Sequence, residues 1–98
     1  MKYIQHIKFS VTTVVGDKEE KSIMSTLGFG EDALDACLKK FFDEIGDSGS
    51  IIVYDDSITR DEHSYELTLK NTEIKDERYA EAKVKLELMY VMEMKVGE

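Results

Sequence analysis

Few side chains in this sequence could act as nucleophiles or general bases. Cys37 is the only cysteine, and His6 and His63 are the only histidines that could activate it. Cys37 belongs to an apolar run with helical spacing, and a cysteine in apolar surroundings keeps its thiol protonated and unreactive. His63 follows two acidic residues, but no serine or cysteine stands at a spacing that would make it the base of a nucleophile. The sequence therefore predicts a structural Cys37 and a protein that is not an enzyme.

A glycine-rich motif precedes the predicted helix. The segment 28–33 reads Gly-Phe-Gly-Glu-Asp-Ala and matches the G-x-G-x-x-A fingerprint of dinucleotide-binding proteins. In that fingerprint a pyrophosphate lies at the helix N-terminus, where Glu31 and Asp32 would repel it, and the surrounding unit is a parallel β-α-β. Because the flanking strands are predicted to form hairpins, we expect no nucleotide site. We expect a flexible connection in which Phe29 closes the edge of the core.

The acidic residues between positions 55 and 62 invite comparison with a metal site. A calcium loop places its ligands at alternate positions around a glycine, in the pattern D-x-D-x-D-G, which this sequence lacks. A zinc site draws on clusters of cysteine and histidine, and the chain has only three such residues. We therefore expect no metal and no other cofactor.

Charge is the strongest signal in the sequence. Its 98 residues include 21 acidic and 13 basic side chains, a net charge of −8, and the segment 31–62 alone holds ten acidic and three basic residues. A chain this acidic is not expected to bind nucleic acid or an anionic membrane directly. The segment either keeps the protein soluble or binds a basic groove of a partner protein. The predicted partner-binding residues are Asp43, Glu44, Asp47, Asp55, Asp56, Asp61 and Glu62.

The second signal is an apolar run near the C-terminus. From Leu88 to Met92 both faces of the predicted strand are apolar, and such a strand needs cover on both sides. The alternating pattern from 80 to 96 would extend about 55 Å, whereas a compact domain of this size is about 35 Å across. Either a bulge bends the strand, or its first turns are helical, or its end reaches a neighbouring molecule.

We expect the last of these outcomes, a homodimer through residues 89–94, because the far end of the strand is the part that is apolar on both faces. The alternative is an ordinary central strand covered by loops. The predicted self-association residues are Met89, Val91, Met92 and Met94.

The first part of the chain is predicted to form two strands. Polar and apolar residues alternate over residues 3–15, which is typical of a half-buried strand. Residues 16–18 are typical of a turn, and residues 20–27 of a second strand with Ile23 and Leu27 facing the core. A helix is the alternative for 20–27, because two acidic residues near its start have the spacing of a capping box.

A helix over residues 31–45 is the clearest element, with an apolar stripe at three- and four-residue steps and Gly46 as its stop. Beyond it, residues 73–82 are compatible with either strand or helix, and period-two alternation favours strand from residue 80. The elements predicted after the helix are a strand at 51–58, a turn at 59–62, a strand at 63–70 with Tyr65, Leu67 and Leu69 inward, a polar stretch at 71–79 with room for a helical turn, and a strand at 80–96.

In order, these elements give β-β-α-β-β-β, an α+β fold in which a single helix packs on an antiparallel sheet of about five strands. The length allows one domain, residues 1–98. No apolar run approaches the roughly 20 residues needed to cross a bilayer. A lone cysteine is typical of a reducing compartment, so we expect a cytoplasmic protein.

Two functions agree with these observations. The first is a small acidic, non-enzymatic protein-binding module, such as an inhibitor of the kind that phages and mobile elements encode. Its carboxylates would stand in for phosphates on the basic, nucleic-acid-binding surface of a partner protein. The alternative is a structural or assembly subunit that acts through its own homo-oligomer.

Overall fold

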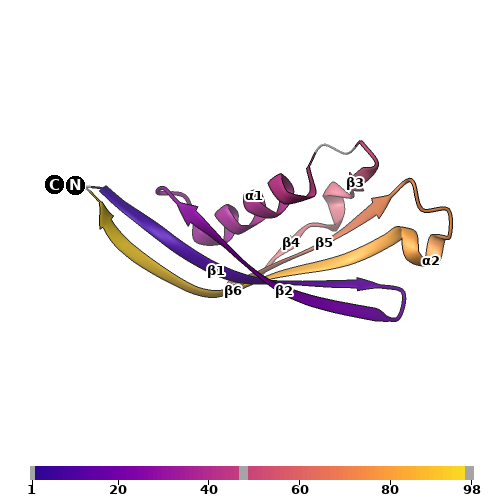
Figure 1. The fold of residues 1–98 in the computed structure, drawn as a ribbon, viewed down its shortest axis with the longest axis horizontal. Helices are drawn as coiled ribbons and strands as arrows, with labels where there is room; N and C mark the ends of the chain where they lie inside the picture. The colour runs from indigo at the N-terminus through magenta and orange to yellow at the C-terminus, as the bar shows by residue number, and fades with distance from the viewer. Residues whose placement is uncertain (1, 47–48, 97–98) are drawn as a thin grey trace.

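The computed structural model describes residues 2–46 and 49–96. Its elements, in chain order, are β1 (Lys2–Val15), β2 (Lys18–Gly28), α1 (Ala33–Ile45), β3 (Ile51–Val53), the 3₁₀ helix η1 (Asp55–Ser57), β4 (Thr59–Arg60), β5 (Ser64–Asn71), α2 (Glu77–Ala80) and β6 (Glu81–Val96). The strands form one antiparallel sheet in the order β2-β1-β6-β5-β3, with β4 paired to β5, and α1 lies over one face (Figure 1). This arrangement confirms the predicted α+β fold.

The core lies between α1 and the sheet face that it covers. Four residues of α1 are buried there, and three of them, Leu34, Cys37 and Phe41, lie at the three- and four-residue steps that the sequence predicted. Alternate residues of β1, β5 and β6 pack against these helix residues, as the period-two patterns predicted. The buried residues are Leu34, Ala36, Cys37 and Phe41 from α1, Ile7, Phe9 and Val11 from β1, Tyr65, Leu67 and Leu69 from β5, and Ala82, Val84 and Leu86 from β6.

Helix α1 begins two residues later than predicted. Asp32 is its N-cap, and its carboxylate accepts hydrogen bonds from the backbone N–H groups of Leu34 at 2.9 Å and Asp35 at 3.3 Å. Capping of this kind satisfies amides that the helix itself leaves unpaired. The expectation that Phe29 closes the core is wrong, because its side chain is 66% exposed. Leu34 is buried at this end of the helix instead.

Strand β2 confirms the strand prediction for residues 20–27, but the predicted inward face is wrong. Ile23 and Leu27 are exposed, and Met24 packs against the core. The cause is the two-residue hairpin turn, which pairs Lys18 with Val15 and so sets the even residues of β2 opposite the odd residues of β1. A shift of one residue in a strand exchanges its two faces.

The predicted strand 51–58 is interrupted. Only residues 51–53 pair with β5, and the chain then makes the turn of η1 before β4 begins at Thr59, inside the predicted turn. Ser57 explains the break, because its hydroxyl donates to the carbonyl of Tyr54 at 2.6 Å and accepts from the N–H of Thr68 at 2.9 Å. A serine side chain thereby occupies a backbone N–H that a continuous neighbouring strand would have used.

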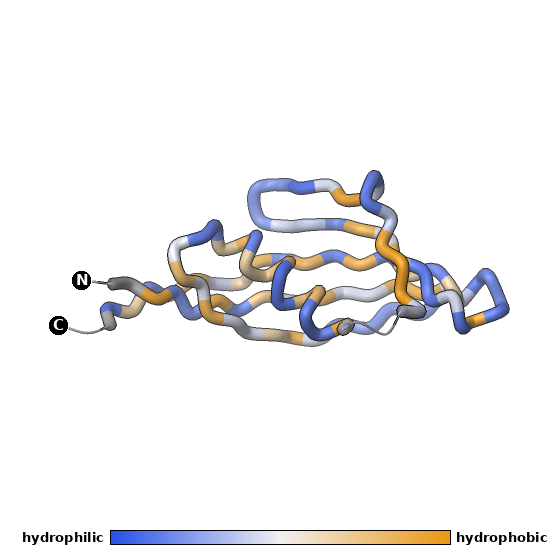
Figure 2. Tube along the Cα trace, turned by 90° about the horizontal axis from the view of Figure 1, so that it is seen from above, coloured by the Kyte–Doolittle hydropathy of each residue, from blue (hydrophilic) through white to orange (hydrophobic). Residues whose placement is uncertain are grey.

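The molecule is elongated, with principal extents of 55 × 24 × 22 Å. The region left open at 73–82 forms the short helix α2 followed by β6. The alternating pattern from residue 80 is therefore almost entirely strand, and its first turns are not helical. A bulge is also present, at Met89, as the register of β1 against β6 shows. Even so, the far end of β6 runs with β1 beyond the helix, to the end of the molecule where both termini lie (Figures 1 and 2).

Candidate interaction surfaces

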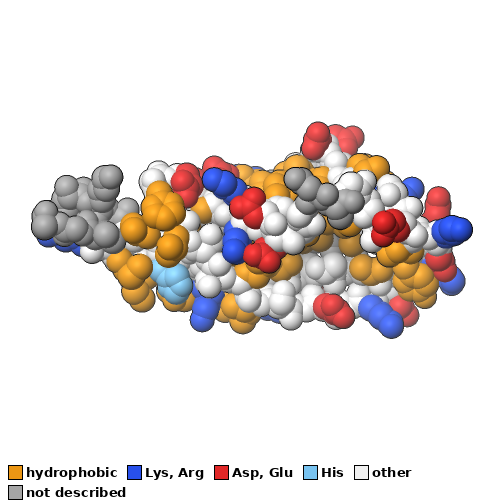
Figure 3. All heavy atoms as spheres, turned by 45° about the horizontal axis from the view of Figure 1, so that its top comes forward, with side chains coloured by type: hydrophobic (Ala, Val, Ile, Leu, Met, Phe, Trp, Pro, Cys, Tyr) orange, Lys and Arg blue, Asp and Glu red, His pale blue; other side chains and the backbone are white. Residues whose placement is uncertain are grey.

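The most exposed apolar surface is at the end of the sheet that carries the termini. We call this part the arm. It consists of residues 2–8 of β1 and 89–96 of β6, flanked over part of its length by residues 25–28 of β2. In Figure 3, hydrophobic side chains gather at this end of the molecule.

One face of the arm, the outer face, is turned away from α1. Leu27 of β2, His6 of β1 and Met92 of β6 lie opposite one another across it, and Met94 lies opposite Ile4 in the next row outward. Leu27, Met92 and Met94 are each exposed over two-fifths to one-half of their surface. Exposed apolar side chains therefore lie on both sides of His6 across the three strands.

The inner face of the arm is apolar too. Val91 lies opposite Ile7, on the side of the sheet that faces α1. Ile7 is completely buried, whereas Val91 remains 38% exposed, so the cover given by the helix ends between these two residues. The prediction that the last third of β6 is apolar on both faces is confirmed by the positions of Val91 and Met92.

The bulge decides which side chains point outward. Phe9 is opposite Leu88 and Lys8 is opposite Tyr90, so that Met89 has no residue opposite it on β1. The even residues of β6 point into the core as far as Leu88, as predicted, but Tyr90 and the even residues beyond it lie on the outer face. An extra residue in one strand reverses the alternation for everything after it.

The arm also contains an unpaired strand edge. Pairing of β6 with β5 ends where Glu87 lies opposite Ser64, and the N–H of Leu88 donates to the carbonyl of His63 at 2.8 Å. Beyond this point, no strand among the described residues pairs with the side of β6 that faces away from β1. Residues 89–96 therefore present free backbone donors and acceptors along that edge.

Polar contacts hold Tyr90 in place on the outer face. Its hydroxyl lies 3.1 Å from Nδ1 of His6, and the two rings meet edge to face with centroids 5.9 Å apart. The ammonium group of Lys8 lies 5.8 Å from the centre of the Tyr90 ring. These contacts lie across two neighbouring strands and keep the ring against the sheet.

The structure distributes the predicted acidic residues over separate elements. Asp43 and Glu44 lie in the last turn of α1, and Glu44 pairs with Lys40 at 3.0 Å. The other described acidic residues of the predicted site are Asp55 and Asp56 in η1 and Asp61 and Glu62 in the β4–β5 connection. All six are exposed, and Asp47 lies outside the described residues. In the view of Figure 3, acidic side chains are scattered among other types.

Sequence reasoning missed a polar cluster around Arg60. Its guanidinium contacts Asp35 at 3.0 Å and Asp32 at 2.9 Å, and it lies over the ring of Tyr65 with its central carbon 5.4 Å from the ring centre. The Tyr65 hydroxyl donates to Asp35 in turn. This cluster ties the start of α1 to β4 and β5. The available signal was that Arg60 is the only lysine or arginine between Lys40 and Lys70.

These contacts shift two pKa values. Partial desolvation of Asp32 raises its pKa, but the hydrogen bonds from Arg60 and from backbone amides outweigh it and hold the pKa below its usual range. The hydrogen bond to Asp35, followed by burial, raises the pKa of the Tyr65 hydroxyl. Both shifts favour the ion-paired arrangement at neutral pH.

The candidate nucleophile and bases lie on separate elements of the fold. Cys37 is completely buried, and desolvation, together with the charge of Asp32, raises the pKa of its thiol to about 12. His6 belongs to the arm, and His63 is exposed in the connection before β5. The arrangement offers no activated thiol.

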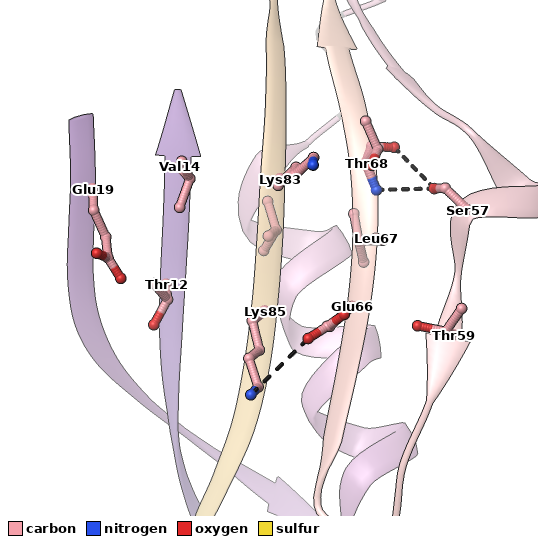
Figure 4. Close-up of a pocket in the computed structure, with 11 residues that line it drawn as sticks. Thr12, Val14, Glu19, Ser57, Thr59, Glu66, Leu67, Thr68, Lys83 and Lys85 are labelled. Atoms are coloured by element: carbon pink, nitrogen blue, oxygen red, sulfur yellow. Dashed lines mark hydrogen bonds and ion pairs between the residues drawn. The ribbon is translucent and has the colours of Figure 1, made fainter. Parts of the chain in front are cut away.

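A groove of about 460 Å³ lies on the open face of the sheet (Figure 4). Its floor carries Lys83 and Lys85 of β6 and Glu66 of β5, with hydroxyl groups from Thr12 and Thr59 at its sides. Lys85 lies 4.0 Å from Glu66. Because charges of both signs alternate across the floor, the groove selects neither an anion nor a cation.

Within the described ranges, no three His, Cys, Asp or Glu side chains converge where a metal ion could be held. Among the same residues, no helix has both the length and the apolar character needed to span a bilayer. Comparison of the chain with models of protein families, with curated proteins and with solved structures finds no match.

Proposed function

We propose that this chain is a small, non-enzymatic protein-binding module whose arm is the binding element. One observation carries the proposal: the arm exposes apolar side chains on both faces, next to an unpaired strand edge. Exposed apolar residues scattered singly need no explanation, but contiguous patches in a small protein mark interaction sites. Methionine-rich surfaces adapt well to a partner, which suits the three methionines of residues 89–94.

A matched pair of substitutions tests the arm. Met92→Lys places a charge in the centre of the outer face, whereas Ile52→Lys places the same charge on β3, at a side chain that is exposed to a similar degree. We expect tagged native protein and Ile52→Lys to retain the same partner from an extract of the source cells, and Met92→Lys to lose it. Equal retention by both variants, with unchanged circular dichroism, would contradict the proposal.

The acidic segment supports a second candidate function. Residues 31–62 hold a net charge of −7, and two of their three basic residues, Lys40 and Arg60, are already paired with carboxylates. Such a segment suits docking on a basic, nucleic-acid-binding surface of another protein, with carboxylates in place of phosphates. The chain would then act as a cytoplasmic inhibitor of the kind that phages and mobile elements encode. The buried, reduced Cys37 agrees with that compartment.

Charge neutralisation separates this candidate from the first. The test variant changes four exposed acids of the segment to their amides, and the control variant changes four exposed acids elsewhere. Loss of the partner in the test variant alone, together with its release by modest salt, supports charge mimicry. The same retention in both variants contradicts it. The test residues are Asp55, Asp56, Asp61 and Glu62, and the control residues are Glu19, Glu20, Glu73 and Glu81.

A further inference from the structure

We infer that the arm binds a second copy of this chain by antiparallel pairing of the two free β6 edges, about a two-fold axis at Met94. The inference rests on the proposed function, in which the arm is the binding element, and it names the partner. Pairing of this kind would extend the sheet from one copy into the next. It would use the free edge of β6, which borders both apolar faces of the arm.

The free edges of β2 and of residues 89–96 of β6 differ in how well they are protected. The first part of the β2 edge carries Lys18, Glu19, Glu20 and Lys21, and charged side chains are the usual protection of an edge strand against pairing. Residues 89–96 of β6 hold only two charged residues, Glu93 and Lys95, and the other six are apolar. The β6 edge is therefore less protected against pairing than the first part of the β2 edge.

The sequence of this edge is complementary to itself. In an antiparallel pair related by a two-fold axis through the sheet, opposite residues lie on the same face and differ by an even number. An axis at Met94 places Glu93 of each copy opposite Lys95 of the other. An axis at Glu93 would instead set two glutamates against each other, and an axis at Met92 would set both charged residues opposite apolar ones. Opposite charges favour a cross-strand pair and like charges disfavour it, so the first register is preferred.

The same pairing brings methionine side chains together on the outer face. With the axis at Met94, the two Met94 side chains meet on the outer face, next to Met92 of each copy. The acidic segment does not oppose this association, because helix α1 and η1 lie along the body of the molecule and the arm projects beyond them (Figure 1). The arm itself holds three lysines and one glutamate, so the net repulsion between two arms is small.

Charge exchange within the edge is the first test. Glu93→Lys would bring lysines face to face, Lys95→Glu would bring glutamates face to face, and the double variant would restore both pairs. We expect each single substitution to raise the dimer dissociation constant by about tenfold or more, and the double variant to return it to within about threefold of the native value. Both residues are exposed, so the fold is not at risk, and Glu19→Lys on β2 is the control. The register is wrong if the single variants have the dissociation constant of the native chain. It is also wrong if the double variant dimerises as weakly as the single ones.

A cross-link is the second test. Met94→Cys should form a disulfide between two copies under mild oxidation, since the two side chains would face each other across the axis, whereas the buried Cys37 takes no part. Ile52→Cys, exposed but on β3, should remain monomeric. Absence of the Met94→Cys cross-link in a chain that is dimeric overturns the pairing.

These results separate the inference from the proposed function. If the native chain is monomeric and Met92→Lys loses a different protein partner, the inference that the arm binds a second copy is wrong. The arm then remains the binding element. If the native chain is monomeric and Met92→Lys changes nothing, both are wrong. If the native chain is dimeric and follows the charge exchange, both are supported.

Discussion

Val91 lies directly opposite Ile7 in the sheet, yet Ile7 is completely buried and Val91 is 38% exposed. The two side chains point to the same face, so the difference between them marks where α1 stops covering the sheet. Everything farther along β6 is sheet without a second layer.

The first prediction concerns Cys37. Cys37→Ala should cost about 1–2 kcal/mol of folding free energy, because it leaves a small cavity in a fully buried position, and it should leave the oligomeric mass unchanged. Urea unfolding and light scattering measure the two effects. Rapid alkylation of the native thiol at neutral pH would contradict the buried, protonated state.

The same thiol gives a pH dependence. Its pKa is about 12 in the folded chain against 9.0 for the free side chain. A group whose pKa is raised by folding contributes stability that is present below the unfolded pKa and is lost as pH rises toward the folded one. The stability advantage of the native chain over Cys37→Ala should therefore shrink by about 1 kcal/mol between pH 8 and pH 10. A constant difference over that interval would show that the thiol is not desolvated.

Arg60→Ala should lower the unfolding temperature most near neutral pH. The contacts with Arg60 hold the pKa of Asp32 below its unfolded value of 3.8, so their contribution is fully present above that pH and is lost as pH falls through the lower pKa of the folded state. The difference from the native chain should shrink as pH falls below 3.8. Lys39→Ala is the control, since it removes one positive charge from the same segment at a residue for which the described part of the chain shows no ion pair. If both substitutions lower the unfolding temperature equally, the cause is the loss of a positive charge and not the loss of the contacts made by Arg60.

Gly28 is required by close packing beneath β2. A Cβ atom at this position would lie 3.0 Å from Oε1 of Gln5 and 3.1 Å from Cδ1 of Ile7. Oε1 of Gln5 is buried and accepts no hydrogen bond from the described residues. Gly28→Ala should therefore cost about 1–2 kcal/mol of folding free energy, and part of that cost should disappear in a Gln5→Ala background. If urea unfolding gives the same cost in both backgrounds, the contact with Gln5 is not the cause of the destabilisation.

The fold class could be predicted from the sequence because the patterns of β1, α1 and β5 each favoured one interpretation. The stripe from Leu34 to Phe41 recurs only with helical period, and Leu67 and Leu69 alternate as one face of a strand. Where prediction failed, the error was in which face of a strand points inward. That depends on strand register, which local sequence patterns do not determine. The inward face of β2 depends on a two-residue turn, and the reversal of β6 depends on one extra residue at Met89.

The candidate surfaces were predictable to a different degree. The apolar character of residues 89–94 is visible in the sequence, but their exposure follows from where α1 ends, which is a property of the packed structure. The contacts of Arg60 join residues 25 and 28 positions apart, and no short-range pattern announces them.

The mass of the native chain in solution tests the central claim most directly. Light scattering should be recorded from about 1 to 100 µM, at about 0.15 M and 0.5 M salt. Pairing through the β6 edge predicts a mass that rises with concentration from 11.2 kDa toward twice that value at both salt concentrations. A mass of 11.2 kDa at every concentration would contradict the pairing of two copies.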